Sequence, residues 1–461
     1  MSSLFGLLGS GATGLRANGF AMSVTSQNAQ NASTAGYTRR DVRLSPLAPP
    51  PDGGGGVTVR GSRRIMDELL DRRVLGATAR RAGAEAKLET LSALDRIFAD
   101  FEGGLGDSLD AFESALTELT DRPSDPATRG QVLAAAERLA SAFQDAATSL
   151  DQAREDADAR IEAEVDGIDE TLSAIGSLGI QIQKAEISGM EASDLRDQRD
   201  QLVRELAEKL PVTTQEDGQG GMTVRLGGLT LVGPDGSTAT LGTTVDATTG
   251  ELRITRRTAG LDQDVTDLID GGALGGMVEA RTGALTEAET ALDQLAFDLA
   301  NAYDAVHTVG FGTDGASGRN LFTPPTSVDG AAAAFSVSAD VAGHPEYLAA
   351  ATDPTLAAGD NRNALALAAV ADSSIGAGGT AQATFGAMLG RAGQAVRGAT
   401  LEVSVATDMA TQLDGLRASV SGVSVDEEMV ALAQYQRGYQ ASLRVIEAAD
   451  QMLQELVNLG R

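Results

Sequence analysis

The chain has no cysteine and no tryptophan, and only 3% of its 461 residues are aromatic. Without cysteine it forms no disulfide, holds no thiolate-bound metal and has no cysteine nucleophile. Because large aromatic side chains are so few, the core must be built from Ala, Leu, Val and Ile, which favours helices packed on helices. His307 and His344 are the only histidines, and neither stands at the spacing of a zinc site. We therefore expect no metal, no cofactor and no enzymatic activity.

Positive charge is also scarce. The chain has 36 Lys and Arg against 65 Asp and Glu, which gives a formal net charge of −29. Such a surface repels phosphate backbones and anionic lipids, so nucleic acids and membrane surfaces are not expected partners. No stretch approaches 18 consecutive apolar residues, so we expect no membrane insertion. The first residues also lack the pattern of a cleavable signal peptide, so secretion would need another export route.

The last forty residues carry the clearest pattern. Positions taken alternately three and four apart from Leu432 to Leu456 are apolar or aromatic, with Ser442 as the exception. This is the spacing of a coiled-coil seam, and the acidic residues 426–428 before it favour a helix N-terminus. The sequence predicts a long, exposed helix that needs a partner. Its predicted subunit-interface residues are Leu432, Tyr435, Tyr439, Ile446, Leu453 and Leu456.

A second seam lies near the N-terminus, where Leu8, Leu15 and Met22 recur every seven residues. This spacing predicts a helix that pairs with the C-terminal one, and these three residues complete the predicted interface. Several glycines in the same segment weaken the helix but also let two helices approach closely. Ordering a chain costs about 1–2 kcal/mol per residue. We therefore expect both ends to be largely disordered in the free monomer and to fold when subunits dock.

Polar and charged residues flank the two seams, and they resemble a known signature. Asn28, Asn31, Thr34, Gly36, Tyr37 and Arg39 match the Asn-rich, Thr-x-Gly-Tyr-x-Arg motif of flagellar rod, hook and hook-associated proteins. The segment 421–428, with Asp426, Glu427 and Glu428, resembles the C-terminus of the hook-associated protein 1 family, as do residues 435–441. Internal stretches at 197–202, 292–296, 307–311 and 363–367 fit the same family.

The resemblance implies a structural subunit of the bacterial flagellum. A member of this family forms a ring of identical copies at the hook–filament junction. Its partners would be the hook protein, the second hook-associated junction protein, a flagellar export chaperone and the type III export apparatus. The chain would be secreted and would work in the extracellular flagellum.

The fold class expected from these patterns is mainly α with β-rich insertions (α+β), in an elongated multi-domain axial protein. The terminal helices would pair as a coiled coil, beside a long-helix bundle and small outer β domains. Apolar periodicity predicts helices over about 127–187, 274–306 and 385–420, and short strands at 57–59, 222–226, 229–232, 251–257 and 335–341. Gly227-Gly228 predicts a hairpin turn between two of these strands. The predicted boundaries are a terminal coiled-coil domain of 1–45 with 421–461, a linker of 46–60, a helical rod of 61–211 with 264–310 and 359–420, a β-rich insertion of 212–263, and an outer irregular or β insertion of 311–358.

Two alternatives remain open. A hook or rod subunit shares the N-terminal motif, although the long acidic helical middle argues against it. An enzyme could use the Gly-rich stretch 9–14, which matches G-x-G-x-x-G. A dinucleotide site of that kind needs a preceding strand at a βα turn, and only eight residues precede Gly9. Bound nucleotide in the purified protein would favour the enzyme.

Overall fold

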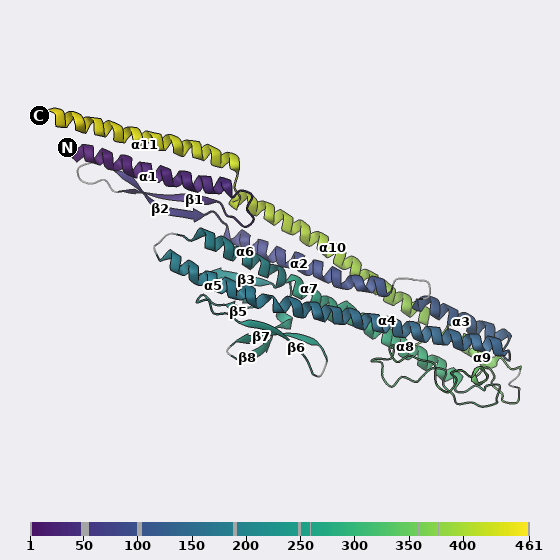
Figure 1. Ribbon diagram of the computed structural model, residues 1–461. Helices are drawn as coiled ribbons and strands as arrows, with labels where there is room; N and C mark the ends of the chain where they lie inside the picture. The colour runs from purple at the N-terminus through teal and green to yellow at the C-terminus, as the bar shows by residue number, and fades with distance from the viewer. Residues whose placement is uncertain are drawn as a thin grey trace. The chain divides into compact units, whose positions relative to one another are not determined.

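Helices predominate in both compact units of the chain, and the strands form small antiparallel sheets (Figure 1). The predicted mainly α class with β insertions is therefore confirmed. Unit 1 comprises Met1–Gly83, Glu164–Leu274 and Val405–Arg461, and unit 2 comprises Ala84–Ala163 and Gly275–Ser404. The computed structural model describes residues 2–47, 55–98, 104–187, 191–247, 250–258, 260–356, 359–376 and 378–459.

The two terminal helices, α1 (Ser2–Gln30) and α11 (Val425–Leu459), pack side by side in unit 1 (Figure 1). Glycine permits this close approach. A Cβ atom built on Gly11 would lie only 2.8 Å from Cγ1 of Ile446, which is too close for two carbon atoms. The predicted pairing of the chain ends is confirmed, and a glycine that weakens α1 is also one of its contact positions.

A β-hairpin lies beside α1. Strand β1 (Arg40–Leu47) pairs antiparallel with β2 (Gly56–Arg64), with an irregularity between Arg43 and Leu44. The sequence predicted a linker over 46–60, with a short strand at 57–59. Residues 46, 47 and 56–60 are instead strand residues. Pro46 is tolerated there because it lies on an edge strand, where a missing N–H is accommodated. Residues 48–54, which hold most of the predicted Pro- and Gly-rich linker, lie outside the described residues.

Long helices make up most of the remaining described chain. The predicted helix over about 127–187 is two helices, because Gly167 separates α4 from α5. The predicted helix over about 274–306 is likewise α7 and α8, joined by a π-helical turn at Arg281–Leu285. The helices are α2 (Glu68–Ile97), α3 (Leu105–Asp121), α4 (Pro126–Asp166), α5 (Ile168–Glu186), α6 (Ser193–Lys209), α7 (Gly272–Ala280), α8 (Thr286–His307), α9 (Arg362–Ala368) and α10 (Ala381–Ser421).

The β-rich insertion of unit 1 holds two three-stranded antiparallel sheets. The predicted hairpin at Gly227-Gly228 is confirmed, and both glycines adopt positive φ angles of 52° and 89° that favour glycine. The predicted strand over 251–257 is β7, whereas β3, β6 and β8 were not predicted. The strands are β3 (Val212–Glu216), β4 (Met222–Leu226) and β5 (Leu229–Val232) in one sheet, and β6 (Thr240–Val245), β7 (Leu252–Thr258) and β8 (Leu261–Asp264) in the other.

Aromatic residues, although few, concentrate in the core of unit 2. The ring of Phe112 on α3 lies 5.0 Å from that of Tyr303 on α8 and 5.6 Å from that of Phe322, both edge to face. The sequence predicted a strand over 335–341. That expectation is wrong: Val337 forms only an isolated bridge, and the segment is otherwise turn and coil. It is held by tertiary contacts instead, with Phe335 buried in this core.

Candidate subunit interface

The face of α11 that contacts α1 carries the predicted seam. A Cβ atom built on Gly14 would lie 2.9 Å from Oγ of Ser442, and one built on Gly19 would lie 3.8 Å from Cε2 of Tyr439. Leu456 is the exception near the end of the seam, with 46% of its surface exposed. The other predicted interface residues are each partly buried: Leu8, Leu15 and Met22 on α1, and Leu432, Tyr435, Tyr439, Ile446 and Leu453 on α11.

These side chains therefore serve the helix pair within one chain, and none is fully buried by it. Their predicted role in contacts between subunits stays a prediction. Because each of these side chains is only partly buried, part of its surface remains exposed, and another copy of the chain could cover it.

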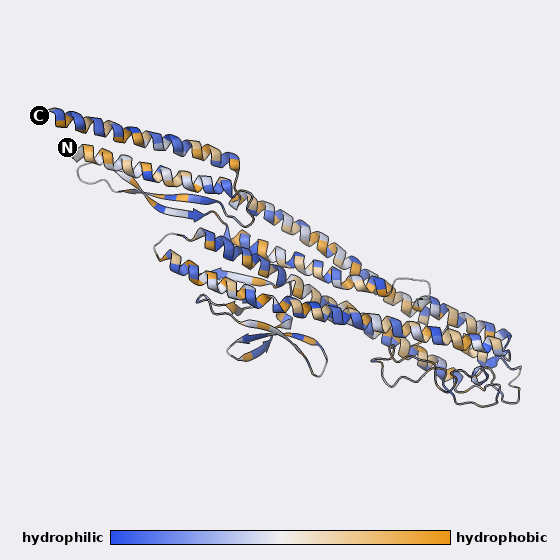
Figure 2. Cartoon of the chain, in the orientation of Figure 1, coloured by the Kyte–Doolittle hydropathy of each residue, from blue (hydrophilic) through white to orange (hydrophobic). Residues whose placement is uncertain are grey.

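A second apolar surface was missed from the sequence. On α10, Val405, Met409, Leu416 and Val420 are between 40% and 58% exposed, and their spacing places them on one face of the helix. Met409 and Leu416 lie in the predicted helix over 385–420, but helical spacing alone does not show whether a face is covered. The four-residue spacing was the available signal. The ribbon of α10 and of α11 carries many residues coloured as hydrophobic in Figure 2.

Further large apolar side chains are exposed along α11. Val430 is 67% exposed, Val457 64%, Met429 55% and Met452 46%. Soluble monomers rarely leave large contiguous apolar patches uncovered. We name the exposed residues Val405, Met409, Leu416, Val420, Met429, Val430, Met452 and Val457 the apolar surface of unit 1.

The motif residues from the two chain ends meet in one buried polar cluster. The amide of Asn28, which is 1% exposed, makes four hydrogen bonds. Its Nδ2 donates to Oε2 of Glu428 at 3.0 Å and to the carbonyl of Arg40 at 2.9 Å. Its Oδ1 accepts from the hydroxyl of Tyr37 at 2.9 Å and from the backbone N–H of Arg40 at 3.1 Å. All hydrogen-bonding capacity of this amide is thus satisfied.

Arg39 fastens the same cluster to the start of α11. Its Nε donates to Oε1 of Glu428 and its Nη1 to Oε2 of Glu427, each at 2.8 Å. The side chain of Glu428 is only 4% exposed, whereas that of Glu427 is 63% exposed. Buried charge-assisted bonds are the stronger kind, so Glu428 contributes more to the joint between α1 and α11 than Glu427 does.

The remaining motif residues act locally. Asn31 donates from Nδ2 to the carbonyl of Gln27, and its Oδ1 accepts from the hydroxyl of Thr34 at 3.2 Å, which together shape the turn after α1. Gly36 has a φ of +82°, a conformation that side chains disfavour. Asp426 is exposed in the first turn of α11, where negative charge favours the helix terminus.

The cluster continues into α6 through two buried arginines. Nη2 of Arg40 lies 2.5 Å from Oδ1 of Asp194 and 3.3 Å from Oδ2 of Asp197. Nη1 of Arg64, at the end of β2, lies 3.1 Å from Oδ1 of Asp197 and 2.6 Å from Oδ2 of Asp200. Burial opposes the charge on Arg64, but the ion pairs with Asp200 and Asp197 outweigh it and raise its pKa. Two carboxylates of the stretch 197–202, those of Asp197 and Asp200, thus form the ion pairs with these arginines.

The internal motif residues of unit 2 anchor the long loop after α8. Asp293 accepts backbone N–H groups from Gly330 at 2.9 Å and from Ala332 at 2.8 Å. Nε2 of His307 accepts the N–H of Ala349 at 2.9 Å, so its Nδ1–H donates to a backbone carbonyl 2.8 Å away. Asn363 donates to the carbonyl of the same alanine at 2.6 Å. These residues therefore shape the fold of unit 2.

None of the considered chemical sites gains support. Burial lowers the pKa of His307 to about 4, and both ring nitrogens are already hydrogen-bonded. The stretch 9–14 lies inside α1 and not at a βα turn, so its geometry does not suit a dinucleotide. The described residues contain no group of three His, Cys, Asp or Glu side chains placed to hold a metal ion. No described helix is long and apolar enough to cross a membrane.

Comparisons with known proteins match both the middle and the end of the chain. The family model of the flagellar hook-associated protein FlgK helical domain matches residues 91–322, and that of the flagellar basal body rod FlgEFG protein C-terminal region matches residues 417–459. Flagellar hook-associated protein 1 of Salmonella typhimurium is 32% identical over 323 residues, which span 68% of this chain and 58% of that protein.

A more complete alignment exists at lower identity. Flagellar hook-associated protein 1 of Escherichia coli is 26% identical over 548 positions, which cover 98% of this chain and 99% of that protein. The solved structure of the flagellar hook junction protein FlgK from Burkholderia pseudomallei superimposes with a TM-score of 0.68 at 16% identity, and covers 76% of this chain and 100% of that one. That likeness establishes a shared fold.

Proposed function

Because the chain belongs to the family of the flagellar hook-associated protein FlgK, we propose that it is a structural subunit of the bacterial flagellum at the junction between hook and filament. Copies of the chain stand side by side in a ring, between the hook protein and the second hook-associated junction protein. The chain catalyses no reaction. It leaves the cell through the type III export apparatus, after an export chaperone has covered its terminal helices, and works outside the cell.

The apolar surface of unit 1 is the observation that carries this proposal. Val430 is 67% exposed and Val405 58%. Full burial of an apolar side chain of this kind contributes about 1.5–3 kcal/mol over leaving it exposed. Neighbouring subunits provide that burial in a ring, whereas a solitary chain does not. Large exposed apolar patches commonly mark sites of protein–protein contact.

The same surface supports coupled folding and assembly. Among the described residues of α11, only Glu428 and Ala449 are buried. A helix with so few buried side chains belongs to the least stable part of a protein. The terminal helices are therefore weakly held in the free monomer and become fixed when other copies dock. Amide hydrogen exchange on the monomer tests this point, because strong protection of residues 432–456 would contradict it.

Deletion of residues 421–461 tests the assignment to the junction. We expect non-motile cells with finished hooks, no filaments, and filament subunits released into the medium. Normal filaments in that strain would overturn the proposed function.

A paired substitution locates the interface more sharply. Val430→Asp places a charge on the apolar surface, which leaves an unpaired charge buried once copies dock. Ile187→Asp is the matched control, because Ile187 is 85% exposed but lies at the end of α5. We expect filament assembly to be lost in the first variant and retained in the second. Equal motility of the two strains would contradict the role given to α11.

A hook or rod subunit is the second candidate, because residues 417–459 match the C-terminal model of the basal-body rod proteins. The deletion strain separates the two possibilities. A missing or truncated hook would favour a hook or rod subunit, whereas a complete hook without a filament supports a junction protein.

A further inference from the structure

Positive and negative charges of unit 1 are separated around its terminal helix pair. Helix α1 carries a single charged residue, Arg16. The adjoining parts of the hairpin, residues 42–47 of β1 and 56–62 of β2, contribute Arg43 and Arg60 and no acidic residue. All three arginines are exposed, and none forms an ion pair with a residue that the structure describes. We name these three residues the basic face.

Strand pairing places two of these arginines next to each other. Arg43 pairs with Gly61 and Leu44 pairs with Val59, so Arg60 is the extra residue of a β-bulge. A bulge sets two residues of one strand opposite a single residue of the other, and Arg60 is therefore a direct neighbour of Arg43. Two like charges at such a position repel each other, and a carboxylate bound to both would relieve that repulsion.

The base of the hairpin differs, because its arginines already have partners. Arg40 and Arg64 form ion pairs with carboxylates of α6, and Arg63 lies opposite Asp41 in the strand register. The positive excess is therefore confined to the basic face, which lies farther along the hairpin and on α1.

The end of α11 has the opposite charge. Residues 445–459 contain Glu447, Asp450 and Glu455 and no basic residue. All three carboxylates are exposed, and none forms an ion pair within the described part of the chain. Asp450 accepts only a hydrogen bond from Gln454 on the same helix. We name these three residues the acidic end of α11.

Both charged surfaces also expose large apolar side chains. On the hairpin, Leu44 is 46% and Leu47 43% exposed, and on α11 Met452 is 46% and Val457 64% exposed. Burial of such side chains supplies the driving force for association, whereas complementary charges select the partner and its orientation. The two surfaces therefore match in both respects.

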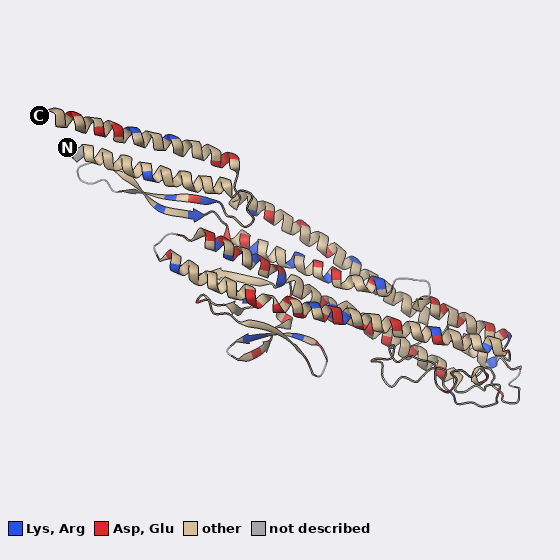
Figure 3. Ribbon diagram, in the orientation of Figure 1, with Lys and Arg blue, Asp and Glu red and all other residues tan. Residues whose placement is uncertain are grey.

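Within one chain the two surfaces are kept apart. Helix α1 lies between α11 and the hairpin (Figure 1), and Figure 3 shows the basic residues of α1 and the hairpin and the acidic residues near the end of α11 on different elements. Arg43 lies about 10 Å along β1 from Arg40, whose backbone bonds Asn28 opposite Glu428. Glu447 lies about 28 Å along α11 from Glu428. A second, parallel copy displaced by about 20 Å along the helix axis brings the two surfaces level.

We propose that the basic face of one copy docks on the acidic end of α11 of a second copy. The inference rests on the proposed function, because assembly places identical copies side by side. The acidic end is selected over the acidic stretch of α4, because that stretch carries Arg154 and Arg160 as well. Since the two surfaces differ, each copy contacts one neighbour through its basic face and another through its acidic end, and the contact continues from copy to copy.

The absence of cysteine makes a disulfide test specific. Ser45→Cys, beside the basic face, and Gln451→Cys, within the acidic end, are introduced into one chain and leave all six charges in place. This chain replaces the normal one in the native host, and the cells are treated with a mild oxidant. We expect a ladder of disulfide-linked dimers, trimers and larger species that disappears on reduction.

A second cysteine pair is the matched control. Gln436 is also an exposed glutamine of α11, but it lies before the acidic end. Ser45→Cys with Gln436→Cys should therefore give no ladder. Equal ladders from the two pairs would overturn the proposal, because they would show contact without the expected displacement.

Charge reversal then tests the ion pairs. In the cross-linking chain, Arg43→Glu with Arg60→Glu should reduce the ladder about tenfold, the change that corresponds to about 1.4 kcal/mol. Glu447→Arg with Asp450→Arg should reduce it likewise. All four substitutions together should restore the ladder, because attraction returns with the signs exchanged. Circular dichroism of each purified variant verifies that the helices are retained.

Several outcomes would overturn the proposal. They are no ladder, cross-links to a different protein, a product that stops at the dimer, and no restoration by the fourfold variant. Antibody labelling of hooks tests the proposed function separately. A ladder in chains that never reach the hook would uphold the contact and overturn the junction, and a hook-bound chain without the ladder would do the reverse.

Discussion

Acidification should destabilise unit 2 through one buried histidine. The His307 side chain is completely buried and makes hydrogen bonds through both ring nitrogens. Nε2 accepts a backbone N–H there, so the ring must stay neutral for that bond to exist. Burial holds the pKa of His307 at about 4, whereas an exposed imidazole has a pKa of about 6.5.

The size of the effect follows from those two values. A difference of about 2.5 pH units corresponds to about 3.4 kcal/mol, at about 1.36 kcal/mol per unit. Between pH 6.5 and 4 the unfolded chain binds a proton that the folded chain refuses, so stability falls as the pH falls. The stabilising effect of the neutral ring is fully present above pH 6.5. About 2 kcal/mol of it should be lost by pH 5.

The chain offers a direct assay because it has only two histidines. Hydrogen exchange at the imidazole C2 position, followed by mass spectrometry, reports the pKa of each ring separately. Denaturant unfolding of His307→Gln then isolates the pH-dependent contribution of His307 to the free energy of unfolding, because glutamine does not titrate. The stability difference between the wild type and this variant should shrink by about 2 kcal/mol from pH 7 to pH 5. His344→Gln, at a ring that is 52% exposed, is the control.

A pKa near 6.5 for His307 would refute this reasoning. So would a stability difference between the wild type and His307→Gln that is the same at pH 7 and pH 5.

Three further predictions concern residues that hold parts of the fold together. Glu428→Gln removes the buried charge of the polar cluster and should lower the free energy of unfolding by about 1.5–3 kcal/mol. Glu427→Gln, at the exposed carboxylate, should lower it by less than about 1 kcal/mol. Equal melting temperatures of the two variants would contradict this. Gly11→Val should cost about 1–3 kcal/mol by forcing the helices apart. An added methyl group at Gly9 would meet no atom within 4 Å outside its own helix. Gly9→Ala should therefore stabilise α1 by up to about 1 kcal/mol. A loss of stability in this variant would contradict the open space beside Gly9. Asp293→Ala leaves two backbone N–H groups of the loop after α8 without acceptors and should cost about 1–3 kcal/mol, with faster amide exchange at residues 330–332; unchanged exchange would show that the carboxylate is dispensable.

Local patterns predicted the elements that depend on neighbouring residues. The α1–α11 pair followed from the seam positions, because helical periodicity is a property of a short window. The β4–β5 hairpin followed from Gly227-Gly228 for the same reason. By contrast, Val405 and Val420 were missed, because a helical period shows that a face is apolar but not whether another element covers it.

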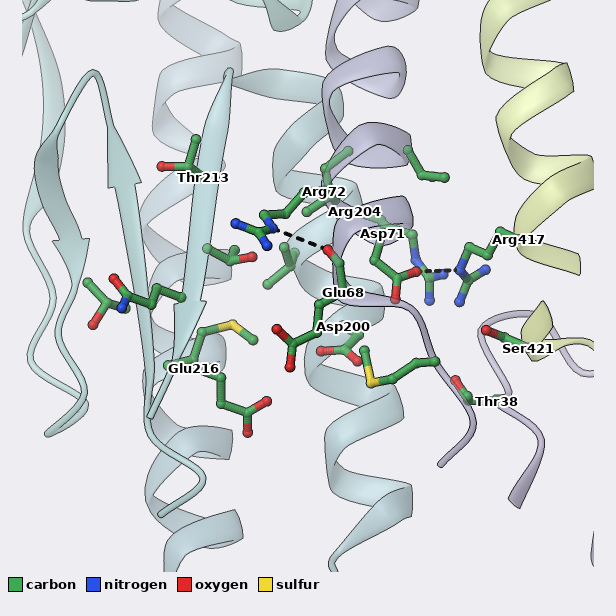
Figure 4. A pocket seen from close by; sticks show the side chains of 18 of the residues that line it. Thr38, Glu68, Asp71, Arg72, Asp200, Arg204, Thr213, Glu216, Arg417 and Ser421 are labelled. Carbon is green, nitrogen blue, oxygen red and sulfur yellow. Dashed lines mark hydrogen bonds and ion pairs between the residues drawn. The ribbon is translucent and has the colours of Figure 1, made fainter. Parts of the chain in front are cut away.

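Contacts between distant residues were beyond sequence reasoning. Asn28 and Glu428 were recognised as motif residues through a resemblance, but their hydrogen bond spans 400 positions of the chain. A motif indicates that a side chain matters without naming its partner. The pocket around Arg204 (Figure 4) shows the same limit, since its lining comes from five separate stretches of sequence, at 38, 66–75, 200–204, 213–225 and 417–421.

The hydrogen bond between Asn28 and Glu428 also fixes the axial alignment of α11 relative to α1. Apolar contact is non-directional and the seam repeats apolar side chains at each turn, so packing specifies the alignment less sharply than a polar pair does. A slip of one turn moves a helix by about 5.4 Å. The buried carboxylate of Glu428 and the buried amide of Asn28 would then lose their hydrogen bond to each other. A single polar pair of this kind selects one alignment out of several. In the proposed ring, this selection gives every copy the same arrangement of its two terminal helices.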